Sequence, residues 1–309
     1  MKKIFIDANI YLNFYDSNKA EFKKLLDSLL EIKDYIFVTS QIANEVRRNK
    51  LEVAKRSLIG HFDTTKITKV SLPRHFDTEI LKIQNWNQES HNLYSQQMQL
   101  REALKSLIHE TLKTIMLSED QVSKVLEQLF DNALVASESE IQLARTRKEL
   151  GNPPGKPNDP LGDQVSWEQF LGYFPNAENM WIITNDQDYF TTFDSKSYLN
   201  PFLYQELVSM NNGNSSIFCF NSLAEGLKHF KEFSHDKIES LPSNEALDDI
   251  SREELSSQAF SIETGKYFPI MTVNEDGDLI QELMFLPPGF ATPNHYIQYL
   301  RAYDSNDIG

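Results

Sequence analysis

The sequence predicts an α/β protein with a parallel central sheet flanked by helices, a long helical insertion and a C-terminal β-hairpin. Short apolar runs alternate with helix-forming stretches near the start of the chain and again after residue 160. This alternation is typical of parallel strands joined by crossover helices. Between residues 60 and 150 the strand pattern is nearly absent, which indicates an insertion built of helices.

The first elements follow from the spacing of apolar residues. Lys-Ile-Phe-Ile is a β-rich run that stops at Asp7, and a second β-rich run, Tyr-Ile-Phe-Val-Thr, precedes Ser40. We expect Ser40 to be the N-cap of the helix that follows. The elements predicted before residue 60 are a strand at 3–6, a helix at 21–30, a strand at 35–39 and a helix at 41–49.

The insertion and the elements after it are equally distinct in sequence. Residues 79–117 and 118–151 are polar and helix-prone, and we expect two long helices packed as an antiparallel hairpin arm. The Pro- and Gly-rich segment 151–160 ends this arm. The elements predicted beyond it are a helix from Gly162, a strand at 181–184, a helix at 201–210, a strand at 216–220 and a helix at 222–230.

The charge distribution predicts a separate C-terminal part. Residues 231–309 hold 5 Lys or Arg against 15 Asp or Glu, a net charge of −10, whereas the whole chain carries −15. We therefore expect a compact domain over residues 1–232 and an acidic linker over 233–260. An extension over 261–309 would follow, with β-strands at 267–273 and 279–286 around an Asp-Gly turn.

Composition excludes several classes of site. The single cysteine, Cys219, excludes an internal disulfide framework and a cysteine-rich zinc site. The histidines are scattered, and no Gly-rich phosphate loop or Ser/His/Cys nucleophile arrangement is found. No apolar run is long enough to span a bilayer, and the first strand carries an acid where a signal segment would be apolar, so we expect a cytoplasmic protein.

Four acidic residues are placed by local pattern at one edge of the predicted sheet. Asp7 and Asp186 follow strands, Glu45 lies beside the buried stripe of a helix, and Asp163 heads the apolar stripe of another helix. Each has an ordinary alternative: a turn or cap residue for Asp7 and Asp163, and a surface position for Glu45. Together, however, such carboxylates need a compensating cation, and Mg²⁺ or Mn²⁺ suits an all-oxygen site that acts on phosphodiester bonds.

The same residues resemble a known family. Phe-Ile-Asp-Ala-Asn at 5–9, the helical Glu45, Gly162-Asp163 and the run Ile-Thr-Asn-Asp-Gln-Asp-Tyr-Phe at 183–190 together resemble the PIN-domain nucleases, in particular larger bacterial PIN-like proteins with a Pro-Pro-Gly loop. The resemblance implies a metal-dependent endonuclease, usually acting on RNA rather than DNA, and a role as a toxin or antiviral effector. The residues that it implies as catalytic and metal-binding are Asp7, Glu45, Asp163 and Asp186, supported by Asn9 and Thr184.

Asp188 needs a separate assignment, because two acids follow the strand at 181–184. Asp186 lies within two residues of the strand end, so we assign it as the metal ligand. We expect Asp188 to cap the following turn.

Two other functions stay open at this point. A haloacid-dehalogenase-type phosphatase also begins with a strand that ends in Asp, but its second acid would stand where this chain has Asn9. A catalytically silent nucleic-acid-binding or scaffold module of the same fold is the stronger alternative, because one fold hosts unrelated functions.

The expected partner is nucleic acid. Basic residues on and after the second helix are expected to contact its phosphates, namely Arg47, Arg48, Lys50, Lys55 and Arg56. The acidic extension after residue 260 is expected to bind a protein partner or to restrain the nuclease by occupying a positive groove. An extra structural layer packed on the domain is the alternative role of that extension.

Overall fold

The computed structural model describes residues 2–16, 20–64, 81–156, 160–176, 179–193, 196–211, 216–234, 241–262, 266–273 and 279–286. Two compact units are distinguished, residues 1–251 and residues 252–309. The predicted turn of the C-terminal hairpin, at 274–278, lies outside the described residues.

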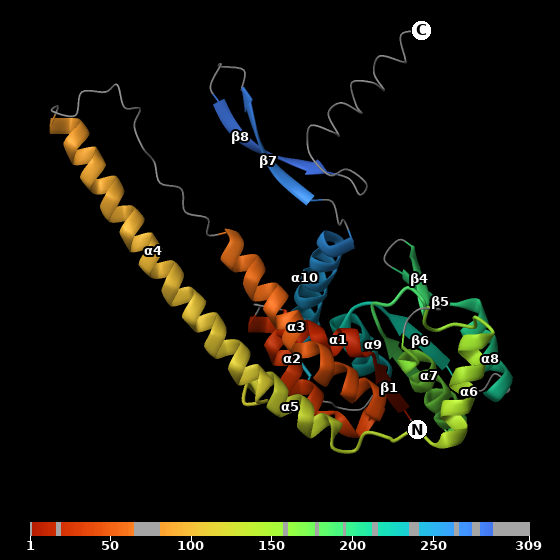
Figure 1. Cartoon of the computed structure of the whole chain (residues 1–309). Coiled ribbons are helices and arrows are strands. Elements are labelled where there is room, and N and C mark those ends of the chain that lie inside the picture. The colour runs from red at the N-terminus through yellow and green to blue at the C-terminus, as the bar shows by residue number, and fades with distance from the viewer. Residues whose placement is uncertain are drawn as a thin grey trace, which may run out of the picture. The chain divides into compact units, whose positions relative to one another are not determined.

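A four-stranded parallel sheet forms the centre of the first unit (Figure 1). Its strands lie in the order β2, β1, β3, β6, and they span Ile36–Phe37, Lys2–Ile6, Asn179–Ile183 and Ser216–Phe220 respectively. The β-branched and aromatic content of these runs favours extended backbone. The burial of β1, β2 and β3 explains why these three are nearly continuous apolar runs, whereas the edge strand β6 is only partly buried. The predicted α/β fold class is confirmed.

Each face of the sheet packs against aromatic side chains of a helix. On one face, Phe5 of β1 contacts Phe170 of α7 (Gly162–Tyr173) with ring centroids 5.5 Å apart. On the other face, Trp181 of β3 contacts Phe230 of α9 (Leu223–Ser234) at 4.9 Å. Because side chains alternate along a strand, Phe5 and Asp7 point to the same side. The α7 face is therefore the one that carries the first candidate acid.

Two helices lie between β1 and β2 in the chain, and a third follows β2. They are α1 (Ala8–Leu12), α2 (Ala20–Glu31) and α3 (Ser40–Thr64), and two short 3₁₀ turns, Asn13–Tyr15 and Lys33–Tyr35, lie between them. The cap of α3 differs from the prediction. Thr39, not Ser40, accepts the Ile42 N–H at 3.2 Å, because the helix begins one residue earlier than expected. The helix also continues to residue 64, well beyond the predicted end at 49.

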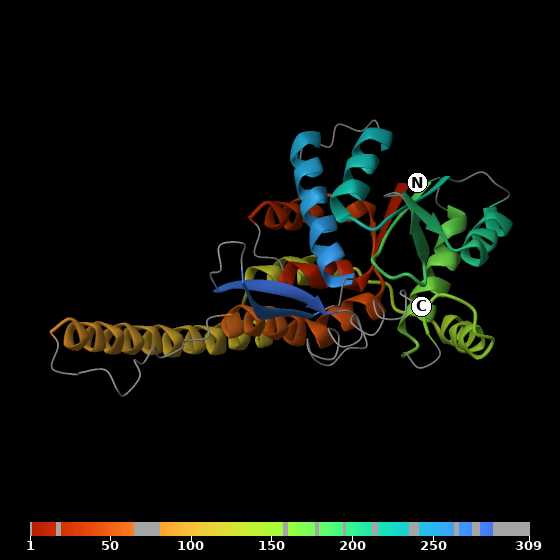
Figure 2. The ribbon, with the colours of Figure 1, turned by 90° about the horizontal axis from the view of Figure 1, so that it is seen from above.

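The insertion is helical, as predicted, but it is not a two-helix hairpin. It contains α4 (Leu81–Met116), α5 (Gln121–Phe130) and α6 (Glu138–Glu149). The second predicted helix is broken, because Ser118 is left-handed at φ 57° and because Asp120 and Ser137 each cap a new helix. In Figures 1 and 2, α4 lies alongside α3 and continues past its end, whereas α5 and α6 lie against the sheet domain.

The chain returns to the sheet after the insertion. Beyond α7, a 3₁₀ turn at Phe174–Asn176 leads into β3, and α8 (Pro201–Asn211) comes before β6. Between β3 and α8 the structure forms a small antiparallel hairpin, β4 (Phe190–Phe193) with β5 (Lys196–Leu199). This hairpin was not predicted, because each strand has only four residues.

The segment predicted as an acidic linker contains a helix. Residues Asn244–Ile262 form α10, and the Ser243 hydroxyl accepts the Ala246 N–H at its start. Leu247 and Ile250 are buried one turn apart, which supplies the apolar anchor that the acidic composition concealed. Lys228 of α9 contacts Asp248 at 2.6 Å.

The predicted C-terminal hairpin is present in the second unit. It pairs β7 (Lys266–Val273) with β8 (Leu279–Leu286) in antiparallel register. Among the described helices of the whole chain, none combines the length and the apolar character that crossing a membrane requires.

Candidate functional site

Asp7 lies at the carboxyl end of β1 and begins α1. Its backbone N–H still donates to Ile183 of β3 at 3.0 Å, so the residue is held by the sheet. Its Oδ1 accepts the Ala8 N–H at 2.7 Å, which makes Asp7 the N-cap of α1. The cap role considered as an alternative is therefore real. It occupies one carboxylate oxygen, and the side chain is only 7% exposed.

The second oxygen of Asp7 joins β1 to β3. The Thr184 hydroxyl donates to Asp7 Oδ2 at 2.7 Å, and Asn9 Nδ2 donates to the same oxygen at 2.9 Å. Asn9 Oδ1 in turn accepts the Asn185 N–H at 3.3 Å. The two residues predicted to support Asp7 thus contact it directly, and they fix the direction of its carboxylate.

Asp186 is held by the same network. Its backbone N–H donates to Thr184 Oγ1 at 3.0 Å, so one hydroxyl orients the two acids that follow β1 and β3. Asp186 Oδ1 also accepts the Asp188 N–H at 3.0 Å. The turn is therefore closed by the side chain of Asp186, whereas Asp188 was predicted to cap it. This hydrogen bond involves Oδ1 of Asp186 and not Oδ2.

Glu45 and Asp163 come from the helices α3 and α7, which pack together. Asp163 lies in the first turn of α7, where Leu161 is the N-cap, so Asp163 is not the cap residue considered as its alternative. Gly162 permits the close approach, because a Cβ at this position would lie 2.5 Å from the amide nitrogen of Gln41. Gln41 precedes Glu45 by one turn of α3. The Gly-Asp pair thus places a carboxylate where the two helices meet.

The electrostatics show that the four acids lie near one another. Burial raises the pKa of the Asp7 carboxyl to about 6; the Thr184 and Ala8 hydrogen bonds oppose the rise, and the charges of Glu45 and Asp186 add to it. Burial also raises the pKa of Glu45, with further contributions from Asp163 and Asp186, while Arg48 lowers it. Mutual repulsion of this kind favours a bound cation.

The residue types fit a hard divalent cation that keeps part of its water shell. Among the residues that the structure describes, no three His, Cys, Asp or Glu side chains are arranged to hold a metal ion. Mg²⁺ binds through one or two carboxylates and several waters, so a closed cage of three acids is not required. Carboxylate oxygens alone, without thiolate or imidazole, also match Mg²⁺ or Mn²⁺ rather than zinc.

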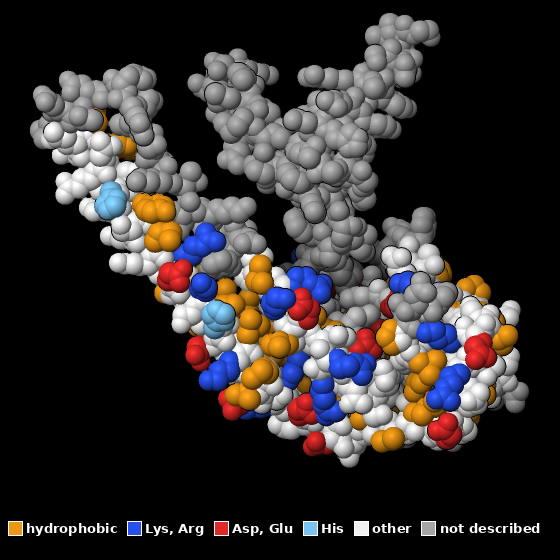
Figure 3. Space-filling view, viewed as in Figure 1, with side chains coloured by type: hydrophobic (Ala, Val, Ile, Leu, Met, Phe, Trp, Pro, Cys, Tyr) orange, Lys and Arg blue, Asp and Glu red, His pale blue; other side chains and the backbone are white. Residues whose placement is uncertain are grey.

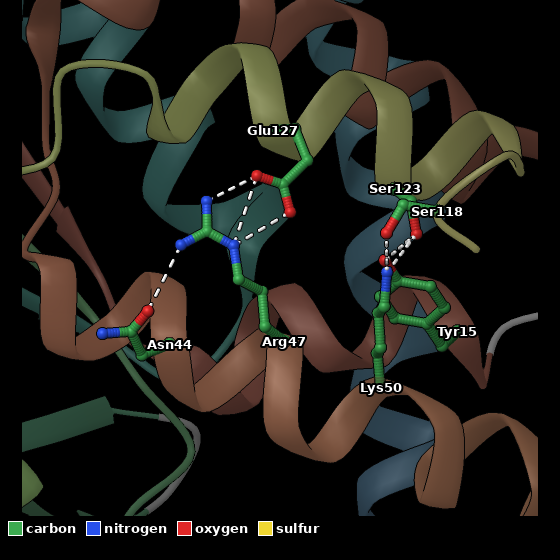
Figure 4. Close-up of polar contacts among 7 residues, drawn as sticks. All are labelled: Tyr15, Asn44, Arg47, Lys50, Ser118, Ser123 and Glu127. Atoms are coloured by element: carbon green, nitrogen blue, oxygen red, sulfur yellow. Dashed lines mark hydrogen bonds and ion pairs between the residues drawn. The ribbon is translucent and has the colours of Figure 1, made fainter. Parts of the chain in front are cut away.

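Two of the predicted nucleic-acid contacts have other partners (Figure 4). Lys50 is buried, and its ammonium donates to the hydroxyls of Ser118 at 2.6 Å and Ser123 at 2.9 Å. We therefore withdraw Lys50 from the predicted nucleic-acid surface. Arg47 is half-exposed, but its Nε donates to Glu127 of α5 at 3.0 Å, and its Nη1 donates to Asn44.

The remaining basic residues of this helix are exposed. Arg48 lies one turn after Glu45, and Lys55 and Arg56 follow two turns later on α3. Lys55 contacts Glu52 of its own helix, as surface pairs at this spacing commonly do. Figure 3 shows one face of the molecule, on which Lys and Arg side chains are interspersed with Asp and Glu over the body of the domain.

Sequence reasoning missed an ion network that holds α7. Arg147 of α6 is 6% exposed and donates to Glu168 of α7 at 2.7 Å and to Glu206 of α8 at 2.7 Å. It also donates to the Pro153 carbonyl, and Trp167 Nε1 donates to Glu206 at 2.9 Å. No local pattern distinguishes Arg147 from the exposed basic residues of the insertion, because its partners are remote in sequence.

The chain matches the model of a known protein family. A family model described as PIN domain matches residues 4–189, which runs from β1 through the insertion to the turn after β3. Searches of curated proteins and of solved structures found no match. The matched range contains all four candidate acids together with Asn9, Thr184 and the basic residues of α3.

Proposed function

The chain belongs to the PIN-domain family, whose members are generally metal-dependent nucleases, and from this premise we propose that it is a Mg²⁺- or Mn²⁺-dependent endonuclease acting on RNA. The observation that carries the proposal is the convergence of four acids from four elements. Two of them, Asp7 and Glu45, have a raised pKa, partly through the charges of the others. A core built for stability alone would not gather carboxylates that repel one another.

In this proposal Asp7, Glu45, Asp163 and Asp186 hold the cation together, one or two of them directly and the others through its bound waters. When bound, such an ion polarises the phosphoryl oxygen, lowers the pKa of bound water and stabilises the leaving oxygen. Thr184 holds Asp7 and Asp186 in a fixed relation through its single hydroxyl. Preorganisation of this kind matters because a ligand set displaced by about 1 Å loses much of its effect.

The nucleic-acid surface of the proposal is smaller than the sequence predicted. It retains Arg48, Lys55 and Arg56, which are exposed on α3 beyond Glu45. Arg48 is the strongest candidate, because its charge already acts on Glu45. Phosphate contacts of this kind would show as salt-dependent binding, with the slope falling by nearly one for each contact removed.

The division into domains also remains a proposal. It comprises a nuclease domain over 1–232, a connecting segment over 233–260 and an extension over 261–309. Because Ser251 of α10 still contacts Glu225 of α9 at 2.9 Å, a deletion that begins at residue 263 is the better test of the extension. Higher turnover of the truncated chain would support restraint by the extension, whereas lower stability would support a structural layer.

The proposed function is tested with single-stranded RNA and DNA oligonucleotides of matched sequence, incubated with Mn²⁺ or with EDTA. We expect cleavage of RNA only with Mn²⁺, and none by the Asp7→Asn variant. Equal cleavage of DNA would refute the choice of substrate.

A silent nucleic-acid-binding module is the second candidate, because no three acids among the described residues are arranged to hold an ion. Binding of the oligonucleotides without cleavage under any metal condition would favour this module over the nuclease.

A further inference from the structure

Tyr189 is a buried residue with a hydroxyl that no described group satisfies. It lies three residues after Asp186, and its backbone N–H donates to the Asp186 carbonyl at 3.2 Å. Its carbonyl accepts the Asn200 N–H at 2.8 Å, so the backbone is held from both sides. The side chain is 0% exposed, yet its Oη has no hydrogen-bond partner among the residues that the structure describes. A buried donor left without a partner destabilises the fold.

The ring of Tyr189 packs against the two elements that carry Asp7 and Asp163. Its centroid lies 6.3 Å from that of Phe5 in β1 and 5.9 Å from that of Trp167 in α7. Phe5 shares a sheet face with Asp7, and Trp167 lies one helical turn after Asp163. The ring therefore contacts both of the elements that position these acids.

The charges around the hydroxyl agree with this placement. Burial raises the pKa of Tyr189 well above its ordinary value, and Asp163, Asp7, Asp186 and Glu45 raise it further in that order. All four candidate acids thus act on one phenol, which stays neutral and keeps its proton. A neutral phenol is a hydrogen-bond donor, and none of the described acceptors takes up the proton of this one.

A bridging water would resolve this mismatch. Buried waters are held by two to four polar partners, and the acids together with the Tyr189 hydroxyl supply that number. Mg²⁺ and Mn²⁺ sites with few carboxylates also retain waters, whose direction is set by hydrogen bonds from outside the ligand set.

We propose that Tyr189 is a positioning residue whose hydroxyl donates a hydrogen bond to a water molecule in the hydration shell of the cation held by the four acids. The inference rests on the proposed metal-dependent function, and it adds a residue that does not itself bind the ion. Its role is to orient the water, while its ring remains part of the core.

Tyr11 offers a matched control within the same chain. It is also 0% exposed, and its hydroxyl also lacks a partner. Its ring packs edge-to-face on Phe130 at 5.2 Å, and Asp7 is the one candidate acid that contributes to its raised pKa. Tyr11→Phe therefore removes the same atom from an equally buried site that faces the insertion.

The test compares the full-length Tyr189→Phe and Tyr11→Phe variants with the wild type. Thermal unfolding is measured in EDTA, and Mn²⁺ affinity is measured by calorimetry without nucleic acid. We expect both variants to unfold at or above the wild-type temperature, because each loses an unsatisfied hydroxyl. Tyr189→Phe should bind Mn²⁺ about 10–100-fold more weakly, as loss of a partner outside the ligand set does, and Tyr11→Phe should bind it as the wild type does.

Three results would overturn the inference. Wild-type Mn²⁺ affinity in Tyr189→Phe would show that the hydroxyl has no role in metal binding. An equal loss of Mn²⁺ affinity in both variants would show a nonspecific effect. A lower unfolding temperature of Tyr189→Phe in EDTA would show that the hydroxyl stabilises the fold instead. If the wild type itself binds no Mn²⁺, the proposed function fails first, and that outcome is visible before any variant is compared.

Discussion

Replacing Asp7 with Asn is expected to stabilise the metal-free protein at neutral pH while abolishing its response to Mn²⁺. The Asp7 pKa is raised from 3.8 to about 6, chiefly by burial. A difference of about two pKa units corresponds to roughly 3 kcal/mol of destabilisation once the carboxyl is ionised. Asn carries no charge, but it replaces one acceptor oxygen with an NH₂ group that faces Asn9 and Thr184, which costs about 1–2 kcal/mol. The net gain should be about 1–2 kcal/mol.

The pH dependence of stability has a definite sign. Between about pH 4 and pH 6 the folded protein keeps the Asp7 proton while the unfolded chain has lost it. Stability in EDTA should therefore fall as the pH rises through this window and level off above it. Glu45, whose pKa is also raised mainly by burial, changes stability in the same direction. The Asp7→Asn variant should lose most of this slope.

Urea unfolding at a series of pH values, in EDTA and then in excess Mn²⁺, measures both effects. The control is Asp16→Asn, which alters an exposed carboxylate at the end of a 3₁₀ turn and should leave the pH slope unchanged. Mn²⁺ should stabilise the wild type and the control but not Asp7→Asn, because only a ligand that binds the folded state raises stability. A variant that is less stable than the wild type at pH 8, with the pH slope intact, would refute the buried-charge argument.

Three further predictions concern single residues. Asp186→Asn should abolish turnover with little change in unfolding temperature, since the amide oxygen can still accept the Asp188 N–H, whereas Asp188→Asn should keep turnover. A cleavage assay and thermal unfolding of both variants test this prediction. Loss of turnover in Asp188→Asn alone would reverse the assignment of the ligand. Arg147→Met should lower the free energy of unfolding by about 3 kcal/mol, because it leaves two partly buried carboxylates without their buried cation; urea unfolding near the wild-type midpoint would contradict this. Arg48→Gln should weaken oligonucleotide binding at low salt and flatten the salt dependence of that binding. Lys50→Met should instead lower the stability of the fold, because Lys50 binds two hydroxyls inside the protein. Equal losses of binding in both variants would restore Lys50 to the nucleic-acid surface.

The sheet could be predicted from sequence because its determinants are local. Each strand is a short apolar run, as expected of parallel strands buried on both faces. The register that aligns Phe5 with Ile182 was not predicted. The break of the insertion had local signals as well. Ser137 and Glu140 form a capping box, and Asp120 caps α5 with its side chain. These signals were outweighed by the absence of Gly and Pro, which made residues 118–151 resemble one continuous helix.

The candidate site likewise has some features that the sequence shows and others that it does not. The strand ends that carry Asp7 and Asp186 are visible in sequence, because an acid directly follows an apolar run. The burial of Lys50 is not visible in sequence, because it depends on hydroxyls 68 and 73 residues away. Tyr189 follows Asp188 in a recognisable motif, but sequence does not show that its hydroxyl lacks a partner.

The insertion supports the candidate site, because a buried basic side chain connects it to each of the two helices that carry acids, Lys50 to α3 and Arg147 to α7. Lys50, on the same helix as Glu45, donates to Ser118 in the turn between α4 and α5 and to Ser123 within α5. Arg147, supplied by α6, holds α7 through Glu168, five residues after Asp163. A buried ion pair tolerates little displacement, since breaking it exposes a large desolvation cost. Changes in the insertion should therefore be transmitted to the spacing between Glu45 and Asp163. Under the proposed function, substitutions in the insertion should then alter Mn²⁺ affinity even though the insertion supplies none of the four acids.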